Sequence, residues 1–469
     1  MQIPILSGVY TDQSSDVRTA YPRNLIPVPQ NSGVSTTYLR PADGIKEFAD
    51  PSSIPNSGID RGGINWNGTC YRVSGGNLVS ISSTGGVTNL GTVGTDGKNI
   101  AIDYSFDRIA IASNGNLFYW DGVSLTQVTD PDLGTVVHMI FIDGYYMTTD
   151  GESLVVTDLA DPTMVNPLKY GSSEVDPDPV VQLMRIKNEA YAINRYTIEV
   201  FSNIGGDLFP FQRIDGAQIS KGAYATNAAS EFMDTVAFVG SGRNESLAVY
   251  IASGGQAVQI STREIDITLQ EADLTNLIVE SRNNKGHEFL YIHLADRTLV
   301  YDANASKALS TNIWFTLTSG LAETGEYRAR NFVYCYDKWL VGDTQSAKIG
   351  EISDRVGSHF TDKVSWDFST VMMYNSSNGL IVHDLEMVAL TGLPVLGDTP
   401  RIATRYSQDG QTWSQKKYIS VGSQGSYNKR LKWLQQGSFR QWRIQQFSGD
   451  SDAMLSPMSI EARIEPLNF

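Results

Sequence analysis

Side chains that could catalyse a reaction or bind a metal are scattered along this 469-residue sequence. None of its histidines stands four residues from another, as the zinc-binding H-E-x-x-H motif requires, and its two cysteines form no C-x-x-C pair. The histidines are His138, His287, His293, His359 and His383. A G-x-S-x-G nucleophile turn, a P-loop and a G-x-G-x-x-G fingerprint are also missing. The sequence therefore indicates no catalytic residue, no metal site and no cofactor.

The most distinctive local motif is Tyr406–Trp413, which reads Tyr-Ser-Gln-Asp-Gly-Gln-Thr-Trp. Its Asp409-Gly410 pair predicts a tight hairpin turn. The hydroxyl groups of Ser407 and Thr412 can bond backbone groups of that turn. The motif resembles the Asp-box of sialidase propellers but is one residue too short. We therefore interpret it as a stable hairpin without chemistry.

Charge is distributed unevenly along the chain. From Gln411 to Gly449 there is no acidic residue. Seven basic residues give this segment +7, so a chain of net charge −15 carries −22 elsewhere. They are Lys416, Lys417, Lys429, Arg430, Lys432, Arg440 and Arg443. Trp433, Phe439 and Trp442 lie among them, and this mixture of aromatic and basic residues is typical of protein interfaces.

We interpret the seven cations as a basic patch that docks against an acidic protein neighbour. A solvated strand face is an equally good explanation of the pattern. Binding to DNA phosphates is a weaker third reading, because the acidic remainder of the chain repels phosphate. An acidic surface suits a conduit through which DNA slides without being held.

The segments that position these residues are predicted strands. Between Tyr71 and Ile352 the sequence repeats one hairpin seven times, with an aliphatic anchor near the start of each second strand. The anchors, 37 to 60 residues apart, are Leu78, Leu117, Leu154, Ile198, Val258, Leu299 and Ile349. Such spacing in all-strand units is typical of β-propeller blades. We predict a propeller over residues 53–353 with about seven blades. The last repeat forms a seventh blade if an amino-terminal strand completes it. If that repeat instead belongs to the junction with the C-terminal domain, the blades number six.

Both ends of the chain differ from the repeats. Residues 1–52 hold no repeat, and the prolines of Tyr21–Pro29 favour extended backbone, so we predict an extended arm that packs on the C-terminal domain. Residues 354–469 contain longer alternating strands, which predict a β-sandwich-like platform for interactions. The fold class is therefore all-β. Leu269–Glu280 is the one helix that we expect.

The cysteine content and the hydropathy of the chain indicate the cellular environment in which it folds. Cys70 and Cys335 are too few for a disulfide framework, and we interpret both as buried, reduced thiols. The first residues, Met1–Leu6, lack a basic segment followed by an apolar core. No apolar run approaches the length of a membrane span. We therefore expect synthesis in the cytosol and no membrane span.

Several motifs, taken together and in order, resemble a known family. The carboxyl-terminal pieces Arg405–Trp413, Gly425–Trp433 and Gly437–Arg440 look like the ending common in phage tail proteins. The earlier pieces are Tyr38–Pro41 with Gly44-Ile45, Tyr71–Leu78, Phe141–Leu159, Leu299–Ala303 and Asp384–Glu386. On these residues the chain resembles the packaged-DNA-stabilising tail hub proteins, also called tail accessory or nozzle proteins, of short-tailed bacteriophages (podoviruses).

The resemblance implies a non-enzymatic virion protein that forms a homohexameric ring beneath the portal and its adaptor. There it would close the channel, stabilise packaged DNA in the capsid and later form part of the ejection conduit. Double-stranded DNA would pass without sequence-specific binding. Other surfaces would meet the tail needle, or plug, and the tailspikes or tail fibres. The protein would occupy the virion tail, and the host cytoplasm during assembly.

Two alternatives stay open on the residues alone. A propeller glycosidase or sialidase could draw an Asp or Glu pair from distant blades, since the chain has 51 acidic residues. A carbohydrate-binding adhesin with the same fold needs no catalytic pair. The segment between Gly205 and Gln256 matches the family poorly. The resemblance therefore does not indicate which partner, tailspike or needle, the surface of this segment would contact.

Overall fold

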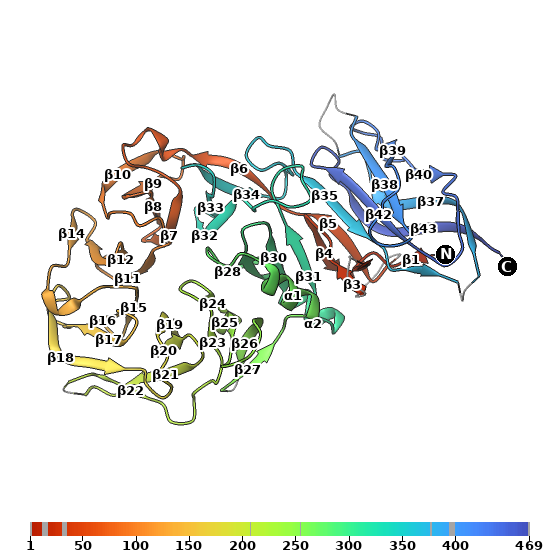
Figure 1. Cartoon of the computed structure of the whole chain (residues 1–469). Coiled ribbons are helices and arrows are strands. Elements are labelled where there is room, and N and C mark those ends of the chain that lie inside the picture. The colour runs from red at the N-terminus through yellow and green to blue at the C-terminus, as the bar shows by residue number, and fades with distance from the viewer. Residues whose placement is uncertain are drawn as a thin grey trace.

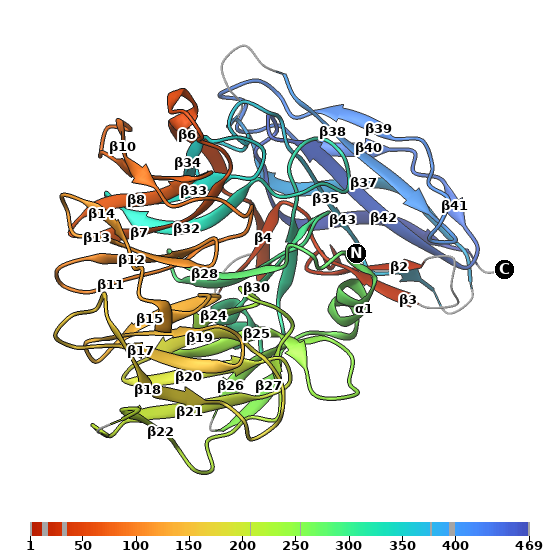
Figure 2. The same cartoon turned by 60° about the vertical axis from the view of Figure 1, so that its left-hand side comes forward.

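The structure is a computed structural model that describes residues 2–11, 17–30, 35–206, 208–253, 255–375, 378–393 and 399–467. Strands form nearly all of its regular structure, and they build two bodies side by side (Figure 1). One is a ring of small sheets and the other a pair of larger sheets that contains the carboxyl terminus (Figure 2). The predicted all-β class, with a propeller and a β-sandwich, is confirmed.

Seven antiparallel sheets, numbered here as blades 1 to 7, follow one another around the ring. Blade 1 contains β7 (Asp60–Trp66), β8 (Thr69–Ser74), β9 (Asn77–Ile81) and β10 (Val87–Thr92), and blade 2 contains β11 (Ala101–Tyr104), β12 (Ile109–Ser113), β13 (Asn116–Trp120) and β14 (Leu125–Gln127). Blade 3 contains β15 (His138–Ile142), β16 (Tyr145–Thr149), β17 (Ser153–Thr157) and β18 (Val165–Ser172), and blade 4 contains β19 (Val180–Ile186), β20 (Glu189–Asn194), β21 (Ile198–Asn203) and β22 (Phe211–Arg213).

The remaining blades vary this plan. In blade 5, β23 (Gly222–Ala223) and β24 (Ala229–Phe232) both pair with β25 (Thr235–Ser241), which is followed by β26 (Ala248–Ser253) and β27 (Gln256–Gln259). Blade 6 contains β28 (Ile278–Asn284), β29 (His287–His293), β30 (Thr298–Asp302) and β31 (Trp314–Leu317). Blade 7 contains β32 (Ala329–Cys335), β33 (Lys338–Asp343) and β34 (Ile349–Ser353), and its fourth strand is β6 (Gly44–Ala49) from the amino-terminal arm. The prediction of about seven blades is confirmed.

Six of the seven predicted anchors lie on the third strand of their blade and are buried, because the two faces of each blade pack against its neighbours. Val258 is the exception. It lies on β27, the outermost strand of blade 5, where its side chain is half-exposed. The equivalent buried residue is Val249 on β26, which divides the long interval between Ile198 and Leu299 into two nearly equal steps.

Pairing of β6 with β34 closes the ring, so the first and last parts of the propeller share one sheet. Ile45 lies opposite Ile352 in this pairing and is fully buried. On the inner side, β32 of blade 7 lies beside β7 of blade 1. The last repeat is therefore completed by an amino-terminal strand, which was one of the two alternatives predicted for it.

A buried polar network joins the same blades. The guanidinium of Arg72 in blade 1 donates to Asp60 Oδ2 at 2.7 Å and to the backbone oxygen of Asn331 in blade 7 at 2.7 Å. The Asn331 side chain donates to Asp60 Oδ1 at 2.9 Å, and its backbone N–H donates to Glu280 of blade 6 at 2.8 Å. Because Arg72 is fully buried, loss of the Asp60 carboxylate would leave its charge unpaired.

The C-terminal body is a sandwich of two sheets. The first has the order β1 (Gln2–Ile3), β43 (Ser456–Pro466), β37 (Leu380–Leu390) and β40 (Leu431–Leu434), with β41 (Ser438–Phe439) also paired to β37. The second has the order β35 (Ser365–Ser369), β42 (Trp442–Asp450), β38 (Arg401–Ser407) and β39 (Lys417–Ser420), with β36 (Met373–Tyr374) paired to β42. Trp366, Phe368, Trp433 and Phe447 pack between the sheets.

Residues 1–52, predicted as an arm on the C-terminal domain, contribute to both bodies. Besides β1, the hairpin of β2 (Gly8–Thr11) and β3 (Val17–Ala20) contacts the sandwich, whereas β6 lies in the propeller. The hairpin of β4 (Leu25–Pro29) and β5 (Thr37–Pro41) contacts β31 on one side and β43 on the other. Arg23 donates through Nε to Asp367 of the sandwich at 2.6 Å and through Nη1 to Thr318 beside blade 6 at 3.0 Å. The arm therefore tethers the sandwich to the ring.

Helices are few. The described residues contain α1 (Arg263–Glu271) and α2 (Ala303–Leu309), together with two short 3-10 turns, η1 (Pro51–Ser53) and η2 (Pro131–Leu133). The prediction of a helix over Leu269–Glu280 is wrong, because α1 ends at Glu271 and β28 begins at Ile278. After α1, the Asp273 carboxylate accepts the Thr275 backbone N–H at 2.9 Å and holds a turn. No helix among the described residues has the length and hydropathy needed to cross a membrane.

Cys70 and Cys335 are both buried and free, as expected for reduced thiols. They belong to one hydrophobic cluster between blades 1 and 7. Burial raises the pKa of the Cys70 thiol to about 11, so this thiol is unreactive at neutral pH.

Replacing Ile45 tests the closure of the ring. We expect Ile45→Ala to lower the free energy of unfolding by about 2–5 kcal/mol, because it leaves a cavity beneath the closing strand. Urea unfolding followed by tryptophan fluorescence measures the change. The control Val123→Ala, on an exposed turn of blade 2, should stay within about 0.5 kcal/mol of the parent. Equal effects of the two changes would show that the β6–β34 pairing does not support the ring.

The buried His138 makes the stability of the propeller depend on pH. Burial lowers the pKa of His138 to about 4, whereas an unfolded histidine titrates near 6.5. The unfolded chain therefore binds the proton first, and the stability from this residue is complete above about pH 6.5 and is lost as the pH falls toward 4.

We expect His138→Gln to remove part of this dependence, on the order of 2 kcal/mol between about pH 7 and pH 5. Thermal melts of parent and variant across this range measure it. Val123→Ala, which changes no ionisable group, serves as the control and should keep the parental slope. If the stability of His138→Gln falls with pH as steeply as that of the parent, His138 is not a source of the pH dependence.

Candidate interaction sites

Six of the seven predicted patch residues lie at one edge of the sandwich. Lys416 and Lys417 lie at the start of β39, Lys429, Arg430 and Lys432 at the start of β40, and Arg440 between β41 and β42. The strands β39 and β40 are edge strands of the two different sheets and lie side by side (Figures 1 and 2). The packing of the sandwich therefore brings together cations that are separated in the sequence.

Three of these cations already have partners within the chain. Arg430 donates through Nε to Glu386 at 2.7 Å, Lys432 lies 3.4 Å from Asp384, and Lys417 donates to the backbone oxygen of Gln435 at 2.6 Å. The Arg430 guanidinium holds the pKa of the Glu386 carboxyl below its ordinary value. Lys416, Lys429 and Arg440 are exposed and have no side-chain partner among the described residues. These three are the cations available to a neighbour.

Arg443 does not belong to the patch, and its assignment is corrected by the structure. Its side chain is fully buried in the sandwich, where Nη1 donates to the backbone oxygen of Gln436 at 2.6 Å and Nη2 to Gln445 Oε1 at 2.7 Å. The guanidinium lies 3.9 Å from the centre of the Tyr406 ring. Burial lowers the pKa of Arg443 to about 10. The sequence does not show that Arg443 is buried, because a count of charged residues does not distinguish buried cations from exposed ones.

The aromatic side chains of this surface also differ from those expected. Trp433 and Phe439 face the core of the sandwich and are buried. The exposed large side chains among the cations are Tyr418, Tyr427 and Leu434. The sequence indicates two of them. Tyr418 precedes Ile419, which packs against the core, and Leu434 follows the core residue Trp433. Neighbouring residues of a strand point to opposite faces, so Tyr418 and Leu434 point outward.

The Tyr406–Trp413 motif forms the hairpin turn expected of it. Asp409 Oδ1 accepts the backbone N–H groups of Gln411 at 2.9 Å and Thr412 at 2.7 Å, and Oδ2 accepts the Thr412 hydroxyl. Ser407 Oγ accepts the Gly410 N–H at 2.7 Å. Hydrogen bonds from Thr412 and Gln411 lower the pKa of the Asp409 carboxyl. This carboxylate is therefore used in stabilising the turn.

The histidines are dispersed as the sequence suggests. His138 is buried in blade 3, whereas His293 and His359 are both buried beside the Tyr327 ring, 6.4 Å and 5.3 Å from its centre. His293 stacks near Tyr291 and Tyr327, and its Nδ1 shares a 3.0 Å hydrogen bond with Thr298. Within the part of the chain that the structure describes, no three His, Cys, Asp or Glu side chains are grouped so that they could hold a metal ion.

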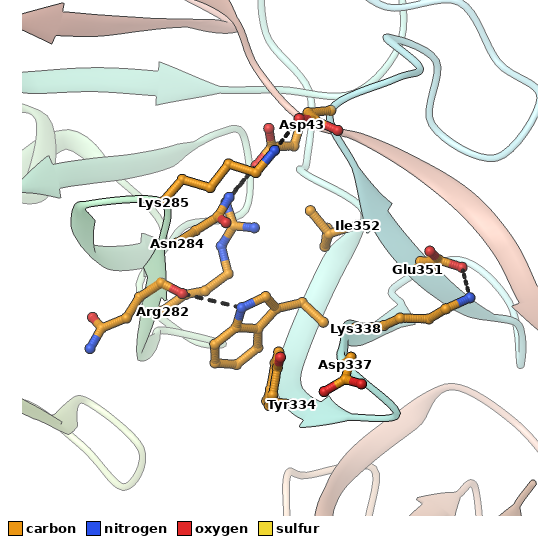
Figure 3. A pocket seen from close by; sticks show the side chains of 12 residues that line it. Asp43, Arg282, Asn284, Lys285, Tyr334, Asp337, Lys338, Glu351 and Ile352 are labelled. Carbon is orange, nitrogen blue, oxygen red and sulfur yellow. Dashed lines mark hydrogen bonds and ion pairs between the residues drawn. The ribbon is translucent and has the colours of Figure 1, made fainter. Parts of the chain in front are cut away.

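A pocket of about 510 Å³ opens between blades 6 and 7, and no sequence motif pointed to it. The β28–β29 turn supplies Asn284 and Lys285, and the β32–β33 hairpin supplies Tyr334 and Asp337 (Figure 3). The same hairpin also supplies Trp339. The other lining residues are Asp43, Arg282, Asn283, Lys338, Glu351, Ile352 and Asp354. These residues come from three distant parts of the chain, so only the closed ring assembles the pocket.

Comparison with known proteins covers nearly the whole chain. Residues 1–357 match the family model described as bacteriophage P22 Gp10, β-propeller, and residues 365–465 match that described as bacteriophage P22 Gp10, β-sandwich. The tail hub protein gp10 of Salmonella phage P22 is 26% identical over 466 residues, which cover 94% of each chain.

Solved structures show more distant likenesses. The Pan2 WD40 domain of Neurospora crassa is 9% identical, with a TM-score of 0.44, over 68% of this chain and 96% of that domain. The extracellular domain of a putative one-component system of B. thetaiotaomicron is also 9% identical, with a TM-score of 0.44, over 91% of this chain and 62% of its own. The two family models, which together match both bodies of the structure, decide the assignment: the chain belongs to the bacteriophage P22 Gp10 family of tail hub proteins.

Proposed function

We propose that this protein is a structural tail hub of a short-tailed phage. It forms a homohexameric ring beneath the portal and its adaptor, closes the channel after DNA packaging, stabilises the packaged DNA and later forms part of the ejection conduit. The observation that carries the proposal is the match to the P22 tail hub protein over 94% of both chains, across propeller and sandwich alike. In this proposal the protein resides in the virion tail, after assembly in the host cytoplasm.

The charge of the chain supports a conduit that does not grip DNA. A net charge of −15 opposes the counterion release through which proteins bind phosphate backbones. Many of the basic side chains are also held by carboxylates of the same chain, as in the Arg72–Asp60 and Arg282–Asp43 pairs. Passage of double-stranded DNA without sequence-specific binding is compatible with such a surface.

Exposed apolar turns on one face of the propeller support docking to other tail components. In a four-stranded antiparallel blade, the turn between the first two strands and the turn between the last two emerge at the same end. In blade 2 these turns expose 97% of Phe106 and 86% of Val123. The corresponding turns of blades 3 and 4 expose Leu159, Ile204 and Leu208. Exposed apolar side chains clustered in this way mark interaction surfaces, and the tail needle and the tailspikes or fibres are the partners that we propose for this face.

The sandwich edge supplies the complementary surface for contacts between subunits. Lys416, Lys429 and Arg440 have no side-chain partner there among the residues that the structure describes, and they lie on the same edge as exposed Tyr418 and Tyr427, while the rest of the chain is acidic. A contact between two different surfaces of the same chain closes into a ring when the rotation allows it. We propose that this basic edge docks on an acidic surface of the neighbouring hub subunit or of the adaptor.

Catalysis is not part of this proposal. The glycosidase alternative was motivated by the Asp409 motif, and that carboxylate accepts four hydrogen bonds that hold its own turn. No observation on the described residues favours the enzyme or the carbohydrate-binding adhesin over the hub.

Electron microscopy of the purified protein tests the proposed function. We expect rings, formed either by the protein alone or on rings of its adaptor, and particles assembled without the protein should lose their packaged DNA. A protein that stays strictly monomeric and never joins a portal–adaptor assembly would contradict the proposal.

Charge reversal tests the basic edge separately. We expect the triple variant Lys416→Glu, Lys429→Glu and Arg440→Glu to lose ring assembly, because it turns attraction to an acidic neighbour into repulsion. The melting temperature of the monomer should change by only a few degrees, since surface charges contribute little to folding. Sedimentation and thermal melts measure the two effects.

The matched control reverses three exposed propeller lysines, Lys98, Lys187 and Lys307. It changes the net charge by the same amount at positions away from the sandwich edge and should leave assembly intact. Normal assembly of the sandwich-edge variant would rule out this edge as the docking surface without touching the hub assignment.

A further inference from the structure

We propose that the pocket between blades 6 and 7 binds an alkylammonium group, the chemistry of a lysine side chain or of a free diamine. This inference rests on the pocket alone and not on the proposed function. The pocket volume of about 510 Å³ lies within the range of roughly 300–1,000 Å³ that is usual for ligand sites. Figure 3 shows Asp43 at one end of the pocket and Tyr334 and Asp337 at the other.

The cations that line the pocket are already neutralised. Arg282 donates to Asp43 at 2.9 Å, Lys338 donates to Glu351 at 2.8 Å, and Lys285 is paired with Asp354. The Arg282 guanidinium also lies over the rings of Phe289, Tyr291 and Phe332, within the propeller. An anionic ligand would have to displace one of these carboxylates, so the pocket does not favour anions.

One carboxylate is left over. Three cations and four carboxylates line the pocket, and Asp337 has no hydrogen-bond or ion-pair partner among the described residues. It occupies the tight turn between β32 and β33, with φ of 56°, and this turn fixes the position of its backbone. Arg40, just outside the lining, also donates to Asp43 at 2.8 Å, so the charges around the pocket balance in number. The unpaired charge is the local one of Asp337, at the end where Tyr334 lies.

Two aromatic rings belong to the same hairpin as that carboxylate and line the same pocket. Tyr334 and Trp339 are directly opposite one another on β32 and β33, and their ring centres are 5.3 Å apart at an angle of 60°. The indole N–H of Trp339 donates to the backbone oxygen of Asn283 at 3.2 Å, which holds the ring in place against blade 6. The faces of Trp and Tyr attract cations, Trp most strongly.

An alkylammonium group satisfies these features together. Its positive end can pair with Asp337, while its methylene chain lies against the indole and Ile352. A neutral polyol of the same length can form hydrogen bonds there but gains nothing from the uncompensated charge. The carboxylate and the rings therefore select for a cation.

The test is calorimetric titration of the full-length protein with 1,4-diaminobutane and with its neutral counterpart 1,4-butanediol. We expect saturable binding of the diamine that weakens with added salt, and no measurable binding of the diol. Titration with the peptides acetyl-Gly-Lys-Gly-amide and its Nζ-acetylated form identifies the source. Binding of the lysine peptide assigns the pocket to a protein side chain, and binding of the diamine alone assigns it to a free amine. Equal binding of diamine and diol, or of neither, would overturn the proposal.

Variants connect the binding to the pocket. Asp337→Asn keeps a residue that tolerates positive φ, so the hairpin should fold normally, and we expect roughly fivefold weaker diamine binding. Trp339→Leu should weaken it to a similar extent and abolish any fluorescence change on binding. Glu152→Gln removes an equally exposed carboxylate without a side-chain partner in a turn of blade 3 and should bind like the parent. Unchanged affinity in Asp337→Asn would overturn the assignment, even if Trp339→Leu failed to fold.

Discussion

Closure of the ring by β6 is the constraint on which the rest of the structure depends. Each blade buries its faces only against its neighbours, so an open ring would expose two apolar faces to water. Two contacts close the ring at blade 7. On its outer strands Ile45 pairs with Ile352, and on the inner strands the buried Arg72–Asp60–Asn331 network joins blade 7 to blade 1. Because β6 lies near the amino terminus, the ring closes only after blade 7 has formed, which couples the two ends of the propeller.

The same arm positions the sandwich. Between β1 in the sandwich and β6 in the ring, the chain passes through Arg23, which bonds both bodies, and through the β4–β5 hairpin, which contacts both. The basic edge of the sandwich and the apolar turns of the propeller are thus held in a fixed relation. In the proposed function, in which these two surfaces contact different partners, such rigidity would keep those partners aligned.

Much of the fold follows from local pattern. The repeat of hairpins predicted the propeller and its approximate blade number, and the change to longer alternating strands predicted the sandwich. Errors arose where a pattern was ambiguous. Val258 is an aliphatic residue with the spacing expected of an anchor, but it lies on an outer strand. The helix predicted over Leu269–Glu280 spans the end of α1 and the start of β28.

The sequence by itself determined the class of fold, the uneven charge and the scarcity of catalytic motifs, because these depend on residue type and on spacing within one hairpin. Only the tertiary structure decided that β6 completes blade 7, that Arg443 turns inward over Tyr406, and that Asp337 and Trp339 share a pocket with Asp43. Each of these outcomes depends on contacts between segments far apart in the chain. Local periodicity records which face of a strand is apolar, but it does not record which distant segment will cover that face.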